Sequence, residues 1–204
     1  VTVSMVGKYT ELADAYMSLN EALRHGGLQN RVDVNINYID SENLKSISQL
    51  KGSDAILIPG GFGHRGINGM IMATKYAREK KIPFFGICLG MQVAVIEFAR
   101  NVLKLKANST EFDKKTNHPV IALMHEWKDS EGSIQKRNAS SDMGGTMRLG
   151  AQKCILSNKS KLKKMYKKSA IFERHRHRFE FNGNYENAII ENGMKIVGRS
   201  TDKK

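Results

Sequence analysis

Residues 82–93 read Ile-Pro-Phe-Phe-Gly-Ile-Cys-Leu-Gly-Met-Gln-Val, and the prediction of the fold depends most on this stretch. The apolar run over 82–87 is typical of a buried strand. After it, apolar residues recur with the spacing of one helix face, at Leu89, Val93, Ile96 and Leu103. Cys88 therefore stands where a strand gives way to a helix, and a strand followed directly by a helix is typical of a parallel sheet.

The same alternation extends toward both ends of the chain. Before this stretch, the pattern predicts strands over 1–6, 32–38 and 55–58, the second of them near a sheet edge, and a helix over 67–80. A further helix is expected to carry Leu12, Tyr16, Leu19 and Leu23 and to end at Gly26-Gly27. After the stretch, strands are expected over 120–124, 152–156, 171–181 and 195–199, with a helix over 187–191. The chain is therefore predicted to have an α/β fold, with a mostly parallel central sheet and helices on both faces.

A chain of 204 residues is expected to form one domain over 1–204. Residues 126–142 are the most polar and least patterned, so we expect an exposed excursion there. Val1 opens directly onto a strand pattern, and Lys203 and Lys204 follow another strand almost at once. Both ends are therefore expected to be cut from a longer chain.

The composition of the chain limits which kinds of partner it is expected to bind. The net charge is +13, but the lysines are scattered apart from a run over 161–168, and no aromatic residues are interleaved with them to stack bases. We therefore expect a solvated surface and no nucleic acid. No apolar run approaches the roughly 20 residues of a spanning helix, so no membrane is expected. Two unrelated cysteines, Cys88 and Cys154, fit a reducing compartment, and a cytoplasmic protein is predicted.

The local sequence around Cys88 is Gly86-Ile87-Cys88-Leu89-Gly90. A tight strand-to-helix turn of this kind holds a nucleophile exposed, and the flanking glycines leave room for a crowded backbone. A thiol at a helix N-terminus is stabilised as a thiolate, and the Leu89 N–H is placed to bind an oxyanion. Taken alone, the pattern fits a structural cysteine in a glycine-rich turn better.

A second glycine-rich segment, Pro59-Gly60-Gly61-Phe62-Gly63, also lies between a predicted strand and a predicted helix. Its N–H groups could supply the other half of an oxyanion hole. A phosphate cradle is the alternative. However, the chain has neither a G-x-x-x-x-G-K-[ST] pattern here nor a G-x-G-x-x-G pattern after the first strand, so nucleotide binding is disfavoured.

Together these two segments resemble the oxyanion strand and nucleophile of class I glutamine amidotransferases. Four further segments are similar to the glutaminase domain of the CTP synthase family: Val6-Gly-Lys-Tyr9, Ala107-Asn-Ser-Thr-Glu-Phe112, Gly144-Gly-Thr-Met-Arg-Leu-Gly150 and Glu173-Arg-His-Arg-His-Arg-Phe-Glu180. The similarity runs the length of the chain.

The resemblance implies a role for each matching residue. Cys88 would attack the side-chain carbonyl of glutamine, and the backbone at Gly61 and Leu89 would hold the oxyanion. Glutamine would be bound by eight residues: Gly61, Phe62, Leu89, Gly90, Met91, Gln92, Glu111 and Arg178. Glu111 and Arg178 offer the opposite charges that an amino acid's ammonium and carboxylate require. Without the motifs, both would be read as surface charges.

The resemblance also implies an activity and partners. Glutamine would be hydrolysed through a thioester, and the ammonia would pass to an N-terminal synthetase domain that converts UTP to CTP with ATP and Mg²⁺. That domain would also imply allosteric GTP and a homo-oligomer, while this domain would need no cofactor. The alternatives are another class I amidotransferase, a catalytically incomplete glutamine-binding domain and, more weakly, a cysteine peptidase.

Two histidine patterns receive no catalytic role. His175 and His177 point to one face of a strand, but a zinc site needs more ligands, so no metal is expected. In the family, the base and its orienting acid come from a His-Pro-Glu sequence. His118-Pro119 is followed by Val120 and lies too early in the chain. We therefore expect the His-Pro-Glu segment to be missing from the printed residues.

Overall fold

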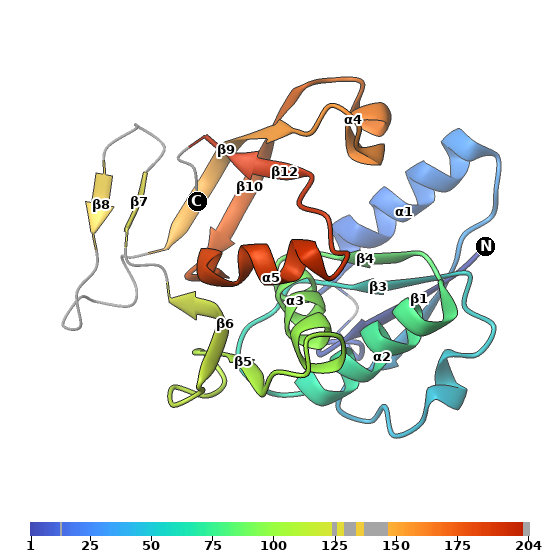
Figure 1. Cartoon of the computed structure of the whole chain (residues 1–204). Helices are drawn as coiled ribbons and strands as arrows, with labels where there is room; N and C mark the ends of the chain where they lie inside the picture. The colour runs from blue at the N-terminus through green and yellow to red at the C-terminus, as the bar shows by residue number, and fades with distance from the viewer. Residues whose placement is uncertain (13, 124–125, 129–133, 137–146, 202–204) are drawn as a thin grey trace. The chain divides into compact units, whose positions relative to one another are not determined.

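A computed structural model describes residues 1–12, 14–123, 126–128, 134–136 and 147–201 of the chain (Figure 1). For 126–128 and 134–136 it describes the backbone alone. The backbone divides into two compact units, Val1–Ala107 and Asn108–Lys204. Each unit is described by itself, and the single domain expected over 1–204 stays a prediction.

The first unit is built on a four-stranded parallel sheet. Its strands are β1 (Thr2–Gly7), β2 (Asn35–Asp40), β3 (Ala55–Ile58) and β4 (Phe84–Gly86), in the order β2-β1-β3-β4. All three neighbouring pairs are parallel. The mostly parallel sheet is therefore confirmed, and so is the edge position of the second strand.

Helices cover both faces of this sheet. They are α1 (Met17–Asn30), α2 (Ile67–Lys80) and α3 (Leu89–Asn101), with a short 3₁₀ helix, η1 (Ile47–Leu50). Alternate strand residues Val3, Met5 and Leu57 pack with Leu19 and Leu23 of α1. The strand order reverses between β1 and β3, and right-handed crossovers then place α2 on the face opposite α1. There α2 contacts α3, and both pack against β3 and β4 (Figure 1).

A buried ion pair joins the two helices on that second face. Glu97 of α3 is only 1% exposed and accepts hydrogen bonds from Arg78 of α2, from Nη2 at 2.9 Å and from Nε at 3.0 and 3.2 Å. A buried carboxylate is tolerated only when it is paired in this way. The hydrogen bond from Arg78 to Glu97 also raises the pKa of Arg78, so the guanidinium stays charged.

Three chain segments meet at the carboxyl ends of the parallel strands. The carboxyl ends of β1, β3 and β4 lead into Lys8, into residues 59–63 and into Cys88 respectively. Between β1 and β3 the chain leaves the sheet in opposite directions, and ligands of open α/β sheets bind outside the carboxyl ends of the strands at such a point.

The described residues of the second unit form three small sheets. Their orders are β10-β9-β12, β11-β6-β5 and β7-β8, and β9–β10, β9–β12, β6–β11 and β7–β8 pair antiparallel. The sequence did not predict this antiparallel pairing. The strands are β5 (Ala107–Ser109), β6 (His118–Leu123), β7 (Glu126–Lys128), β8 (Ile134–Lys136), β9 (Arg148–Leu156), β10 (Ala170–His177), β11 (Phe179–Phe181) and β12 (Gly198–Ser200). The helices are α4 (Lys161–Tyr166), η2 (Gly183–Tyr185) and α5 (Glu186–Glu191).

Most predicted elements are present, with shifted ends. The exposed excursion predicted over 126–142 contains β7 and β8, and its other residues lie outside the described part of the chain. The lysine-rich run over 161–168 forms the solvated helix α4 and the residues after it. Among the described residues, no helix is both long and apolar enough to cross a membrane.

The prediction of a buried strand over 82–87 is only partly right. β4 covers three residues, and Phe85 is 60% exposed. The physical reason is that β4 lies at the end of the strand order and pairs only with β3 in the described part of the chain. An apolar run alone does not distinguish a central strand from an edge strand.

The predicted end of the first helix is wrong. α1 passes through Gly26-Gly27 and ends at Asn30, where Arg31 takes the left-handed conformation with φ 56° and its N–H bonds to the carbonyls of Gly27 and Leu28. Leu12 lies before the helix and is 62% exposed. Gly27 lies inside the helix and packs so closely against the chain at Val32 and Val34 that a Cβ would not fit there.

Replacing these adjacent glycines separately should shift stability in opposite directions. A Cβ on Gly26 meets nothing within 4 Å, so Gly26→Ala should raise the free energy of unfolding by about 0.5–1 kcal/mol. A Cβ on Gly27 would lie 2.7 Å from the Val32 carbonyl oxygen, so Gly27→Ala should lower it by about 1–2 kcal/mol. Urea denaturation measures both. Equal shifts of the same sign would contradict the packing of α1.

Candidate functional site

The site is organised by the turn that holds Cys88. Cys88 has φ 52° and ψ −105°, which is a strained conformation for a residue with a side chain, and it is half-buried. The flanking glycines make the turn possible. A Cβ on Gly90 would lie 2.2 Å from the Ile58 carbonyl oxygen, and one on Gly86 would lie 2.5 Å from the backbone of Gly90. Both glycines of the G-x-C-x-G pattern are therefore required, because the backbone leaves no room for a Cβ at either position.

The first turn of α3 begins directly after Cys88. The Gly90 N–H donates to the Ile87 carbonyl at 2.9 Å, and the Gln92 N–H donates to the Cys88 carbonyl at 3.2 Å. Leu89 is the first helical residue, and the N–H of such a residue has no acceptor within the helix. An N–H group and a helix N-terminus beside the thiol both favour negative charge there.

The glycine-rich loop after β3 lies against this turn. A Cβ on Gly60 would lie 3.5 Å from the Cβ of Cys88, and one on Gly61 would lie 3.2 Å from Cδ2 of Leu89. Three residues that the sequence selected from two separate motifs, Gly61, Cys88 and Leu89, are thus brought together. Their catalytic roles stay predictions.

The other predicted residues of the first unit surround this contact. Gly90 and Gln92 are buried in the first turn of α3, while Phe62 of the loop and Met91 of the helix are 47% and 43% exposed. The structure adds Lys8, to which sequence reasoning gave no role. Its ammonium bonds to the loop at Phe62 and Gly63. Apart from the segment Val6-Gly-Lys-Tyr9, no signal in the sequence marks this lysine.

Glu111 and Arg178 belong to the second unit. Glu111 is half-buried just after β5, and its N–H donates to the Ser109 hydroxyl at 3.1 Å. Arg178 is half-buried between β10 and β11. The strand predicted over 171–181 is therefore wrong as a single element, because the chain leaves one sheet and enters another at Arg178.

A buried ion pair fixes this change of sheet. Arg148 is only 2% exposed and lies opposite His177 in the pairing of β9 with β10. Its Nε donates at 2.7 Å to Oε1 of Glu180, which is in β11. Arg148 thus joins the strand before Arg178 to the strand after it. Residues 173–178 are all polar or charged and include no glycine or proline, so the sequence pattern could not reveal the junction.

The histidines beside Arg178 form part of the same junction. Nδ1 of His175 lies 2.8 Å from Nε2 of His177, whose Nδ1 lies 3.1 Å from the Phe179 carbonyl oxygen. Burial, and then the nearby Arg148, lower the pKa of His177 to about 4, so this imidazole is neutral at physiological pH. Among the described residues, no group of three or more His, Cys, Asp or Glu could hold a metal ion.

The two longest motifs of the second unit therefore meet in space. Arg148 comes from the segment 144–150 and Glu180 from the segment 173–180, and residues 144–146 of the first segment lie outside the described part of the chain. The second cysteine has a different setting. Burial, and then Glu173, raise the pKa of the Cys154 thiol, which disfavours the thiolate form.

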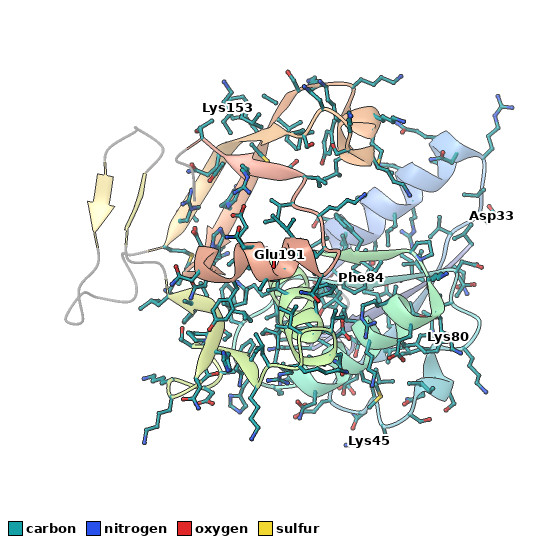
Figure 2. All side chains as sticks on the ribbon, in the orientation of Figure 1. Asp33, Lys45, Lys80, Phe84, Lys153 and Glu191 are labelled. Carbon is teal, nitrogen blue, oxygen red and sulfur yellow. The ribbon has the colours of Figure 1, made fainter. Side chains whose placement is uncertain are left out.

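The surface around both units carries outward-pointing lysines. Figure 2 labels Lys45, Lys80 and Lys153, whose side chains extend away from the ribbon, and all three are exposed. Scattered exposed lysines agree with the solvated surface predicted from composition. The absence of a nucleic-acid partner stays a prediction.

Comparisons with known proteins agree with the resemblance found in the sequence. A family model described as glutamine amidotransferase class-I matches residues 11–204. The chain is also similar to a solved structure of the glutaminase domain of Trypanosoma brucei CTPS with bound acivicin, at 36% sequence identity and a TM-score of 0.83. That similarity covers 97% of this chain and 74% of the other.

The strain in the turn at Cys88 should lower the free energy of unfolding of any variant that keeps a side chain there. Cys88→Gly and Cys88→Ala both remove the thiol, but only glycine adopts φ 52° without steric cost. Strain of about 1–3 kcal/mol, reduced by the greater entropy of an unfolded glycine, predicts that Cys88→Gly is more stable than Cys88→Ala by about 0.5–2 kcal/mol. Urea denaturation of the two variants tests this. An alanine variant at least as stable as the glycine variant would show that the turn is unstrained.

Proposed function

The chain belongs to the class I glutamine amidotransferases, and on this basis we propose that it hydrolyses glutamine at Cys88 as the glutaminase domain of a CTP synthase. The observation that carries the proposal is the strained turn at Cys88, with Gly60 and Gly61 packed beside it. The similarity to the CTPS glutaminase domain supports the narrower assignment.

In the proposed first half of the reaction, the Cys88 thiolate attacks the side-chain carbonyl carbon of glutamine. A tetrahedral intermediate forms, and its oxygen carries the negative charge. Collapse of the intermediate breaks the carbon–nitrogen bond, and the nitrogen takes up a proton and departs as ammonia. A γ-glutamyl thioester remains on the sulfur of Cys88. Water then attacks the thioester, and glutamate and the free thiol are regenerated.

The oxyanion of both tetrahedral intermediates would be bound by backbone N–H groups. Leu89 offers the N–H at the start of α3, and Gly61 lies against its side chain. Donors fixed before the reaction need no reorganisation when charge develops, and losing one such donor typically costs about 10²–10³ in kcat. The glycines at 60 and 61 allow this close approach of backbone to substrate.

Recognition of the glutamine head group would depend on charge. We assign the α-ammonium to Glu111 and the α-carboxylate to Arg178, with Gln92 near the reacting amide. The ion pair between Arg148 and Glu180 supports the assignment of Arg178, because it fixes the chain on both sides of that residue. Phe62, Gly90 and Met91 would complete the contacts, and acivicin, bound in the solved relative, is a candidate ligand.

Proton transfers need a general acid–base group, which commonly contributes about 10²–10⁴ in rate. We assign this role to none of the described histidines. His177 is neutral but is engaged by His175 and the Phe179 carbonyl, and the 204 residues contain no His-Pro-Glu sequence. The proposal requires an imidazole as the general acid–base group, and in the family the histidine of the His-Pro-Glu sequence supplies it.

Ammonia released at Cys88 would be used by a synthetase domain of the same protein to convert UTP to CTP. ATP and Mg²⁺ would act in that domain, and GTP activation, a homo-oligomeric state and a cytoplasmic location are further parts of the proposal. Another class I amidotransferase would pass its ammonia to a different acceptor. A glutamine-binding domain without catalysis would release no ammonia.

The function is tested by separating the two nitrogen sources in the full-length protein. Cys88→Ala should abolish CTP formation from UTP and ATP when glutamine is the nitrogen source, and should leave CTP formation from added ammonia largely intact. The reason is that only the source of ammonia is lost. CTP formation is followed with each nitrogen source.

Cys154→Ala is the matched control, since the raised pKa of Cys154 disfavours a thiolate and its replacement should leave both activities unchanged. Equal loss of both activities in Cys88→Ala would contradict the proposed role of Cys88. Glutamate release by the unaltered protein without any CTP formation would instead indicate another amidotransferase.

A further inference from the structure

Lys8 is a charged residue buried at the centre of the site. It follows β1 directly, is 6% exposed, and its Nζ donates to the carbonyl oxygen of Phe62 at 2.8 Å and to that of Gly63. The methylene groups of its side chain also approach the loop. A Cβ on Gly61 would lie 3.7 Å from Cδ and 3.8 Å from Cε of Lys8.

The loop that Lys8 contacts cannot fix its own conformation. Residues 60, 61 and 63 are glycines, which have the widest range of backbone angles, and Gly63 has a φ of 73°. In a trans peptide the C=O and N–H point in opposite directions. An ammonium bound to the carbonyls of Phe62 and Gly63 therefore orients the two peptide units that follow Gly61. The close approach of the Lys8 methylene groups to Gly61 restrains the loop at Gly61 itself.

Lys8 is itself held rigidly by neighbouring elements. The N–H groups of Lys8 and Tyr9 both donate to the Tyr16 hydroxyl, at 3.1 and 3.2 Å, and the Lys8 carbonyl accepts from Nη2 of Arg65 at 2.9 Å. The preceding Gly7 carbonyl accepts from the Ser41 N–H at 2.8 Å. The end of β1 is therefore a fixed point to which the flexible loop is attached.

We propose that Lys8 is a positioning residue for glutamine hydrolysis, which holds the glycine-rich loop in the conformation that presents the Gly61 N–H to the oxyanion. The inference rests on the proposed function. It assigns Lys8 an effect on the transition state and none on the binding of ground-state glutamine, because its ammonium is already engaged by loop carbonyls.

The test compares Lys8→Met, Lys8→Arg and Lys51→Met in the full-length protein. Lys8→Met keeps most of the side-chain length and removes the donor, so kcat for glutamate release should fall about ten- to a hundredfold while KM for glutamine stays within about threefold. Lys8→Arg restores a cationic donor and should recover part of the lost kcat. Lys51 is exposed after η1, and Lys51→Met should match the unaltered protein.

A second readout separates the loop from the nucleophile. Iodoacetamide alkylates a thiolate at a methylene carbon without forming an oxyanion, so its rate with Cys88 should be the same in Lys8→Met and in the unaltered protein. A parallel fall in alkylation and in kcat would overturn the proposal, because Lys8 would then act on the thiol. A rise in KM at unchanged kcat would overturn it too, because Lys8 would then be a binding contact.

Hydrogen exchange tests the same contact independently of activity. Amide exchange over residues 61–64 should be faster in Lys8→Met than in Lys51→Met, and unchanged exchange would contradict the positioning role.

If Lys8→Met does not fold, Tyr16→Phe removes only the hydroxyl beneath Lys8 and should give a smaller change of the same kind. Absence of glutamate release in the unaltered protein would count against the proposed function, and the exchange result would still decide the role of Lys8.

Discussion

The close approach of the β4–α3 turn to β3 is the constraint on which the site depends. A Cβ at Gly90 would come within 2.2 Å of the Ile58 carbonyl, and Cys88 accepts a φ of 52° in the same turn. Because of that approach, the thiol, the first N–H of α3 and the glycine-rich loop share one edge of the parallel sheet. A looser turn would separate these groups, and oxyanion stabilisation requires donors that are already in place.

Polar groups that are buried in the structure serve mainly to hold backbone segments in position. Lys8 joins the end of β1 to the loop after β3, Glu97 joins α3 to α2 through Arg78, and Arg148 joins the strands on either side of Arg178. Each burial is costly unless the charge is paired or hydrogen-bonded. Lys8 and Arg148 restrain segments whose own sequence does not fix their conformation, and Glu97 holds two helices together.

The sequence predicted the parts of the fold that depend on local pattern. The parallel sheet, the helix over 67–80 and the turn at Cys88 follow from hydrophobic periodicity and glycine spacing. What it did not predict depends on distant contacts. The exposure of Phe85 follows from strand order, the end of α1 follows from the packing of Gly27 against Val32, and the break at Arg178 follows from the ion pair of Arg148 with Glu180. Lys8 had no pattern of its own, because its partners are backbone carbonyls of another segment.

The central claim is that Cys88 forms a covalent bond to the γ-carbonyl carbon of glutamine. It is tested most directly by mixing the full-length protein with isotopically labelled glutamine, quenching in acid at short times and mapping the label by peptide mass spectrometry. The account predicts a γ-glutamyl group on the peptide that contains Cys88 and none on the peptide that contains Cys154. Label on another residue, or steady glutamate release with no label on Cys88 at any quench time, would contradict it.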